Sequence, residues 1–277
     1  MTQPAAPLTF GAVDGLGFAA AGGLLGAARK SAPYYPTSLG PLLELLHHAA
    51  SGRLPLPPGG SWLVENTAAP MIAALKENRE SWVDPHDRRT GFIRAIRRGP
   101  DGGARLTGFL MHAKRAARDA ARLPGSTPGQ LIAAMAELES NIHEHSDAPE
   151  TGLLAFRAAQ GTFEFVVVDR GIGILKSLQR CAEYAALPDH GKALTAALSD
   201  GVSRFGPDSR RGHGFRQMFL GLVDLYGSLR FRSGDYALFV DGTSPDLTTA
   251  QLAQKPALDG FFASVRCRSD AAATGMN

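Results

Sequence analysis

The chain has 277 residues, of which 44% are hydrophobic and 20% charged, so it can bury a proper core, and disorder is excluded over most of its length. Its 32 glycines and 18 prolines show no collagen-like period, which indicates many loops and excludes a fibre. The net charge of +3 argues against wholesale nucleic-acid binding, and two cysteines supply neither a disulfide framework nor a metal cluster.

The most apolar segment, Gly15 to Ala28, is rich in glycine and alanine and predicts a buried helix that packs closely through small residues. It is shorter than the roughly 20 residues that a membrane span requires. Neither Lys nor Arg precedes it, in contrast to a signal peptide. We therefore expect a cytoplasmic protein without a membrane segment.

The first hundred residues predict a strand near Leu8 to Phe10, then this helix, and further helices over Leu39 to Ala50 and Met71 to Glu80. The Gly/Pro-rich run 99–103 breaks the chain, because neither helix nor central strand tolerates such a sequence. We place a domain boundary there. Residues 1–105 are predicted to be an N-terminal, mostly helical α/β extension of unassigned type.

The pattern is more regular from residue 106 onward, where helices, a hairpin, a helical insertion and further strands follow one another. This order predicts an α+β domain over 106–270, a two-layer α/β sandwich whose mixed, mainly antiparallel sheet is covered by helices on one face, and a disordered tail over 271–277. The expected elements are helices Thr107–Leu123 and Thr127–His145, the hairpin Leu153–Ala158 and Thr162–Val168, a helical stretch Leu175–Leu198, a loop Gly201–Arg211, a helix from Gly214 to Tyr226, and strands Leu229–Arg232, Tyr236–Val240 and Phe261–Arg268.

Three separated motifs carry the chemistry of this domain. Glu137, Asn141 and His145 recur every four residues, so they line one flank of a helix beside its apolar stripe. Asp169-Arg170-Gly171-Ile172-Gly173-Ile174 follows an apolar strand, and Arg211-Gly212-His213-Gly214-Phe215 opens a helix. Glycines let the backbone approach a ligand, and the free amides of a helix start favour phosphate.

In this order and at this spacing, the motifs resemble the N, G1 and G2 boxes of the ATP-binding domain of the GHKL superfamily. That superfamily includes gyrase-type topoisomerases, heat-shock chaperones of the ninety-kilodalton class, histidine kinases and MutL. The resemblance covers roughly residues 107–268 and implies that the chain binds ATP and Mg²⁺. Asn141 would hold the Mg²⁺ that bridges the phosphates, and Asp169 would accept the exocyclic amine of adenine.

The resemblance also assigns the remaining positions. Glu137 would be the catalytic residue that activates the attacking group, and His145 would lie near the phosphates. Base and ribose would lie along Gly171, Gly173 and Ile174, and the phosphates would be wrapped by Arg211, Gly212, His213, Gly214 and Phe215. Arg204 and Arg210 would belong to the ATP lid.

The sequence departs from the family in the last strand. Gly260 is followed by Phe261 where the family often has a threonine near the adenine, and Ser264 is only a weak substitute. Zinc binding by His143 and His145 is not expected, because residues two apart on a helix point to different sides.

The kind of superfamily member follows from what surrounds the motifs. His112, in the preceding helix, lacks the acidic follower of a phosphoacceptor histidine, which disfavours a cytoplasmic histidine kinase. Gyrase- and MutL-type proteins carry a second domain after the ATPase, whereas a short tail follows Arg268 here. The chain looks most similar to stand-alone ATP-binding proteins such as anti-sigma-factor serine kinases.

Two classes of function therefore remain open. One is a Mg²⁺-dependent protein serine kinase or ATPase with a regulatory role, and the other is a non-catalytic module whose binding surface changes with nucleotide. The run from His86 to Arg122 holds ten Lys and Arg residues and three Asp residues, which is typical of a solvated basic face. The alternative is a docking surface, and an acidic regulatory partner is then favoured over nucleic acid. The sequence leaves oligomerisation open.

Overall fold

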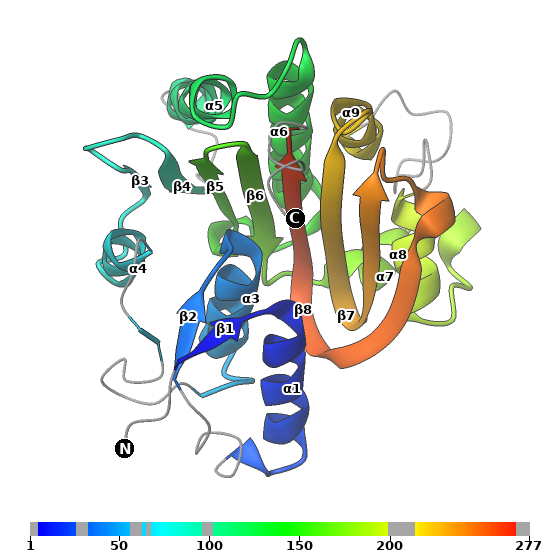
Figure 1. The fold of residues 1–277 in the computed structure, drawn as a ribbon. Coiled ribbons are helices and arrows are strands. Elements are labelled where there is room, and N and C mark those ends of the chain that lie inside the picture. Colours follow the sequence, from blue (N-terminus) through cyan, green and yellow to red (C-terminus); the bar gives the residue numbers. More distant parts are fainter. Residues whose placement is uncertain are drawn as a thin grey trace. The chain divides into compact units, whose positions relative to one another are not determined.

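The protein is an α+β protein built from two compact units, Met1–Arg79 and Glu80–Asn277 (Figure 1). None of the described helices combines the length and apolar character that a membrane crossing requires. The computed structural model describes residues 5–25, 33–55, 63–64, 68–95, 102–198 and 214–269, with the side chains of 214–217 left out.

The first unit is built around two short parallel strands that a helix connects. Ala6, Pro7 and Leu8 pair with Tyr34, Tyr35 and Pro36, and the connecting helix packs against the next one. The elements of this unit are β1 (Ala6–Leu8), α1 (Phe10–Ala21), β2 (Tyr34–Pro36), α3 (Leu39–Ala50) and α4 (Ala69–Lys76).

Helix α1 differs from the expected buried helix in position and in burial. It begins earlier because the Oγ1 atom of Thr9 accepts a hydrogen bond from the amide of Ala12 at 3.2 Å and so caps the first turn. It ends before Gly23, whose φ of 71° is a left-handed conformation. Its buried residues are Val13, Asp14 and Gly17, and Phe18 is 52% exposed, so the prediction of a wholly buried helix is wrong.

The second unit contains a six-stranded sheet with the order β3-β4-β5-β6-β8-β7. Each pairing in this sheet is antiparallel, where the sequence led us to expect a mixed sheet. The elements are β3 (Ser81–Val83), β4 (Thr90–Arg94), α5 (Gly102–Asp119), α6 (Thr127–His145), η2 (Pro149–Thr151), β5 (Leu153–Ala159), β6 (Thr162–Asp169), α7 (Gly173–Leu178), η3 (Ala182–Tyr184), α8 (His190–Leu198), α9 (Gly214–Gly221), β7 (Tyr226–Thr243), η4 (Leu247–Thr249) and β8 (Gln251–Arg268).

One face of the sheet forms a common core with the helices. Side chains alternate between the faces of a strand, and Phe163, Phe165 and Val167 of β6 share one hydrophobic cluster with buried residues of α5, α6, α8 and α9. Helices α5, α6 and α9 lie on the same side of the strands in Figure 1. The layered α/β arrangement expected from the sequence is thus present in this unit.

The sheet unit begins earlier in the chain than the expected boundary at residues 105/106. Strands β3 and β4 pair with each other and then with β5, so residues from Glu80 onward belong to the same compact unit. The Gly/Pro-rich run 99–103 is therefore a break inside a unit. The beginning of the unit depends on pairing between strands that are distant in the sequence, and local turn signals do not predict such pairing.

The predicted hairpin of β5 and β6, with β6 in the interior of the sheet, and the predicted helix Thr127–His145 are confirmed. The last part of the chain differs, because the two short strands expected around Ser233-Gly234-Asp235 are one long strand, β7, with an irregularity at Gly234. The helix that opens at Gly214 ends at Gly221 and not near Tyr226. The expected loop 201–211 and tail 271–277 lie outside the described residues.

Candidate functional site

Helix α6 presents its polar flank as the sequence predicts. The stripe of Leu131, Met135, Leu138 and Ile142 is buried, and Glu137, Asn141 and His145 are half-buried beside it. Half-buried polar side chains at the border of the core are accessible to a ligand, and the helix fixes the direction in which they point.

His143 lies on the opposite flank of α6 from His145 and pairs with a neighbouring carboxylate. His143 Nε2 lies 2.8 Å from Glu139 Oε1, one turn away on the helix, and both side chains are nearly buried. No group of three or more His, Cys, Asp or Glu side chains that could hold a metal ion occurs among the described residues. His143 thus has an intrahelical partner on a different flank from His145.

Asp169 ends the central strand β6 and is the most perturbed carboxylate of the site. Its residue is only 4% exposed, and its carboxylate accepts hydrogen bonds from the amides of Gly171, at 2.8 Å, and Phe261. Burial raises the pKa of Asp169 to about 6, because removal from water outweighs the two amide bonds that favour the charged form. A buried acceptor of this kind is a polar anchor for a ligand that donates a hydrogen bond.

A bulge in β8 closes one side of this carboxylate. Gly234 of β7 is paired with Leu258, whereas Ser233 is paired with Phe261, so Asp259 and Gly260 are extra residues on β8. Gly260 has a φ of 72°, and a Cβ atom there would lie 2.6 Å from Oδ1 of Asp169. The backbone of Gly260 thus lies directly against the aspartate.

Gly171 joins the Asp169 turn to the end of α6. A side chain at Gly171 would overlap the carbonyl oxygen of Ser146, and that oxygen accepts a hydrogen bond from the amide of Ile172 at 2.9 Å. The Oγ atom of Ser146 in turn donates to the carbonyl of Ile142 at 2.6 Å. Glycine is therefore required at 171 by the close approach of protein segments, whatever ligand binds nearby.

Gly173 and Ile174 are held by strand β7. Gly173 has a φ of 75°, and a Cβ atom there would lie 2.8 Å from Oγ of Ser233. The amide of Ile174 donates to the same Oγ atom at 2.9 Å, while its side chain packs at the edge of the core. Sequence reasoning missed Ser233, because Ser233-Gly234-Asp235 has the composition of a turn.

The registers of three strands place Asp169, Phe261 and Ser233 in one row across the sheet. Odd-numbered residues of β6 face the helices, so this row lies on the helix-covered face. Ser264 pairs with Val166 and has the opposite parity to Phe261, so it points to the other face. Ser264 therefore does not face the side of the sheet on which Asp169 lies.

The row lies at one end of a path that follows α6. Asn141 precedes Ser146, the contact point with the Asp169 turn, by five residues, which is about 7.5 Å along a helix axis, and Glu137 by nine, about 13.5 Å. From the Asp169 turn, Asn141 and then Glu137 therefore follow in that order along the axis of α6.

Helix α9 lies along the same part of α6. Gly221, its last residue, packs against Gln130 and Leu131 at the beginning of α6, and the two helices stay in contact, so they run antiparallel. Gly214 lies seven residues before Gly221, a rise of about 10.5 Å, which brings it toward the middle of α6 at about the level of Glu137. The other residues of the third motif, Arg211, Gly212 and His213, lie outside the described residues, as do Arg204, Arg210 and the side chain of Phe215.

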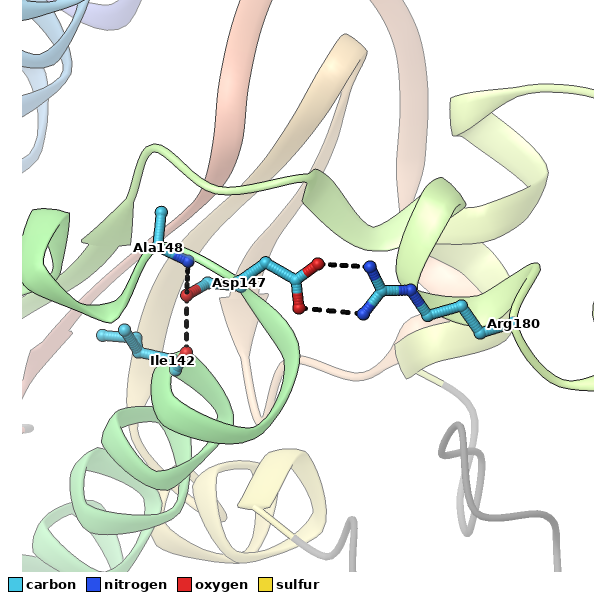
Figure 2. Close-up of polar contacts among 5 residues, drawn as sticks. Ile142, Asp147, Ala148 and Arg180 are labelled. Carbon is cyan, nitrogen blue, oxygen red and sulfur yellow. Dashed lines mark hydrogen bonds and ion pairs between the residues drawn. The ribbon is translucent and has the colours of Figure 1, made fainter.

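An ion pair ties the segment after α7 to the end of α6. The guanidinium of Arg180 makes two hydrogen bonds to the carboxylate of Asp147, one of them at 2.8 Å (Figure 2). Asp147 has a φ of 61° and directly follows Ser146. The tie is half-exposed, so it orients the segment more than it stabilises the fold.

Comparison with known families does not identify the site. No protein-family model matches the chain, and no curated protein matches it significantly.

Proposed function

We propose that the unit Glu80–Asn277 binds ATP with Mg²⁺ and belongs to the GHKL superfamily. The observation that carries this proposal is the buried Asp169 carboxylate at the end of the central strand, followed along α6 by Asn141 and Glu137. Asp169 is the fixed acceptor for the exocyclic amine of adenine. The phosphates then extend toward Asn141 and the beginning of α9.

The donor set suits a metal ion held jointly with the ligand. Asn141 offers one amide oxygen, and the described residues contain no acidic cluster that would form a complete protein cage. Mg²⁺ prefers oxygen ligands and is commonly bound by one or two protein groups together with substrate phosphates. When bound, the ion would neutralise phosphate charge, while Asn141 fixes its position.

Glu137 is the candidate base of a phosphoryl transfer to a partner serine or to water. It lies on the same flank as Asn141, one turn further from the Asp169 contact, and is half-buried. A regulatory protein serine kinase or ATPase is the reaction class we favour. The competing class is a non-catalytic module in which nucleotide alters a binding surface.

Thermal unfolding tests the binding step. Wild-type protein is heated with ATP, ADP or GTP, each with and without Mg²⁺. A ligand at 100 times its dissociation constant stabilises the folded state by about 2.7 kcal/mol, which raises the melting temperature measurably. We expect ATP with Mg²⁺ to stabilise most, and Asn141→Ala to lose the Mg²⁺-dependent part. Equal melting temperatures under all conditions would contradict the proposal.

Incubation with γ-labelled ATP tests the reaction step. Release of labelled phosphate indicates an ATPase, and label on a candidate partner protein indicates a kinase. Glu137→Ala is expected to keep ATP affinity and lose turnover, because the base acts only in the transition state. Wild-type protein that binds ATP and yields neither product is the result that favours the non-catalytic module.

We propose the exposed basic surface of α5 and the β3–β4 turn as the docking site for an acidic protein partner. The pKa of His112 is lowered by burial and by the positive charges of Arg88 and Arg115, so charges from the β3–β4 turn and from α5 act on the same side chain. Lys114 is exposed on α5 and extends this surface, whereas Arg118 is paired with the carboxylate of Asp119. Binding of a polyglutamate probe should weaken steeply with salt and with Arg88→Glu/Arg115→Glu. Tighter binding of duplex DNA than of the acidic probe would overturn the assignment.

A further inference from the structure

Ser233 is a fully buried serine whose hydroxyl joins three separate segments of the site. Its Oγ atom donates to the carbonyl of Gly260 at 2.9 Å and accepts from the amide of Ile174 at 2.9 Å. The hydroxyl thus bonds strand β7 to the bulge of β8 and to the first turn of α7. A buried hydroxyl with both its donor and one acceptor function in use is held in one orientation.

Both bonded segments reach the Asp169 carboxylate. Gly260 lies directly against Asp169, and its left-handed conformation belongs to the bulge that turns β8 toward this residue. On the other side, Gly173 and Ile174 continue the turn whose Gly171 amide donates to Oδ1 of Asp169. A shift of either segment would therefore move the Gly260 backbone that lies against the Asp169 carboxylate or the Gly171 amide that donates to it.

We propose that Ser233 is a positioning residue of the proposed adenine site and fixes the Asp169 carboxylate through the Gly260 bulge and the Gly173–Ile174 turn. This inference rests on the proposed nucleotide-binding function. Ser233 has no exposed surface, so it acts through its neighbours and not by touching the nucleotide. The consequence is specificity: an acceptor held in one place distinguishes a purine with an amine at position 6 from a purine with a carbonyl there.

The magnitude follows from the chemistry of buried partners. A site built to bond an N–H group rejects an analogue without it by a factor of about 10⁴, because the buried acceptor is left without a partner. ITP differs from ATP by the carbonyl at position 6, whose oxygen faces the carboxylate. An aspartate that can tilt away avoids this conflict, so weaker positioning lowers the preference for ATP.

The experiment compares the dissociation constants of ATP and ITP by calorimetry in the full-length wild-type protein and its variants. Ser233→Ala removes both hydrogen bonds. Ser233→Cys keeps a similar volume but is a weak donor and acceptor, so it is the variant to use if the alanine protein does not fold. Ser233→Thr restores the hydroxyl. Ser264→Ala, in the neighbouring strand but on the opposite face, is the matched control.

We expect wild type and Ser264→Ala to prefer ATP by a factor of about 10⁴, and Ser233→Ala and Ser233→Cys to lose at least about tenfold of that preference. Ser233→Thr should recover it. A purely structural role would lower stability and leave the ratio of the two constants unchanged, and that result would overturn the inference. Wild-type protein that binds neither nucleotide would instead overturn the proposed function itself.

Discussion

Replacing Asp169 by asparagine is expected to stabilise the unliganded protein at neutral pH. The folded-state pKa of about 6 lies above the ordinary value of 3.8, so ionisation of the aspartate costs stability from about pH 3.8 upward and the full cost is present above pH 6. The two pKa values differ by about 2.2, and a difference of one in pKa corresponds to about 1.36 kcal/mol, so the cost is about 3 kcal/mol. Asparagine carries no charge but offers one acceptor oxygen in place of two, which costs about 1 kcal/mol. The net gain at pH 7.5 is therefore about 2 kcal/mol.

The sign reverses as the pH falls. A raised carboxyl pKa means that the folded state holds its proton more tightly than the unfolded state, so wild type gains stability as the pH drops through 6 and has the full gain below 3.8. At pH 4.5, about 1.5 below the folded pKa, wild type has regained about 2 kcal/mol relative to pH 7.5. The advantage of Asp169→Asn should then disappear.

Urea unfolding of wild type and Asp169→Asn at pH 4.5 and 7.5 checks this directly. Other titrating groups are present in both proteins, so their effects cancel in the difference between the two free energies of unfolding. A difference that stays the same at both pH values would refute the argument that burial of an ionised Asp169 costs stability.

Three further predictions concern packing, thiol reactivity and the Arg180 tie. Gly171→Ala should lower the free energy of unfolding by about 3 kcal/mol, because its methyl group would overlap the Ser146 carbonyl. Gly108→Ala, in an open position on α5, should raise the free energy of unfolding by about 0.5–1 kcal/mol. Equal urea midpoints for the two variants would contradict the close approach of Gly171 to Ser146. Burial raises the pKa of the Cys267 thiol to about 12. An aromatic disulfide reagent at pH 8 should therefore react with Cys181 in the native protein and with Cys267 only after unfolding. Rapid reaction of both thiols in the native protein would show that β8 is open. Arg180→Ala should leave the urea midpoint unchanged and speed proteolysis of the segment after α7, and a large drop in the midpoint would show that the ion pair does more than orient that segment.

Local patterns predicted much of the second unit, and long-range contacts decided the rest. The four-residue spacing from Glu137 to His145 and the apolar run of β6 each belong to one continuous segment, so the sequence alone located them. The role of Ser233 depends on a strand register and a bulge that bring Gly260 and Ile174 to its hydroxyl. Likewise, strands β3 and β4 are too short to be recognised without their partner β5. Residues far apart in the chain decide both features, and a single sequence does not report such pairings.

Calorimetric titration of ATP with Mg²⁺ into wild type and Asp169→Asn at pH 7.5 tests the central claim most directly. We expect wild type to bind one ATP per chain. Asp169→Asn, although folded and more stable, should bind none, because its amide cannot serve as the same charged acceptor for the adenine amine. Equal ATP affinity in the two proteins, or no binding to wild type, would contradict it.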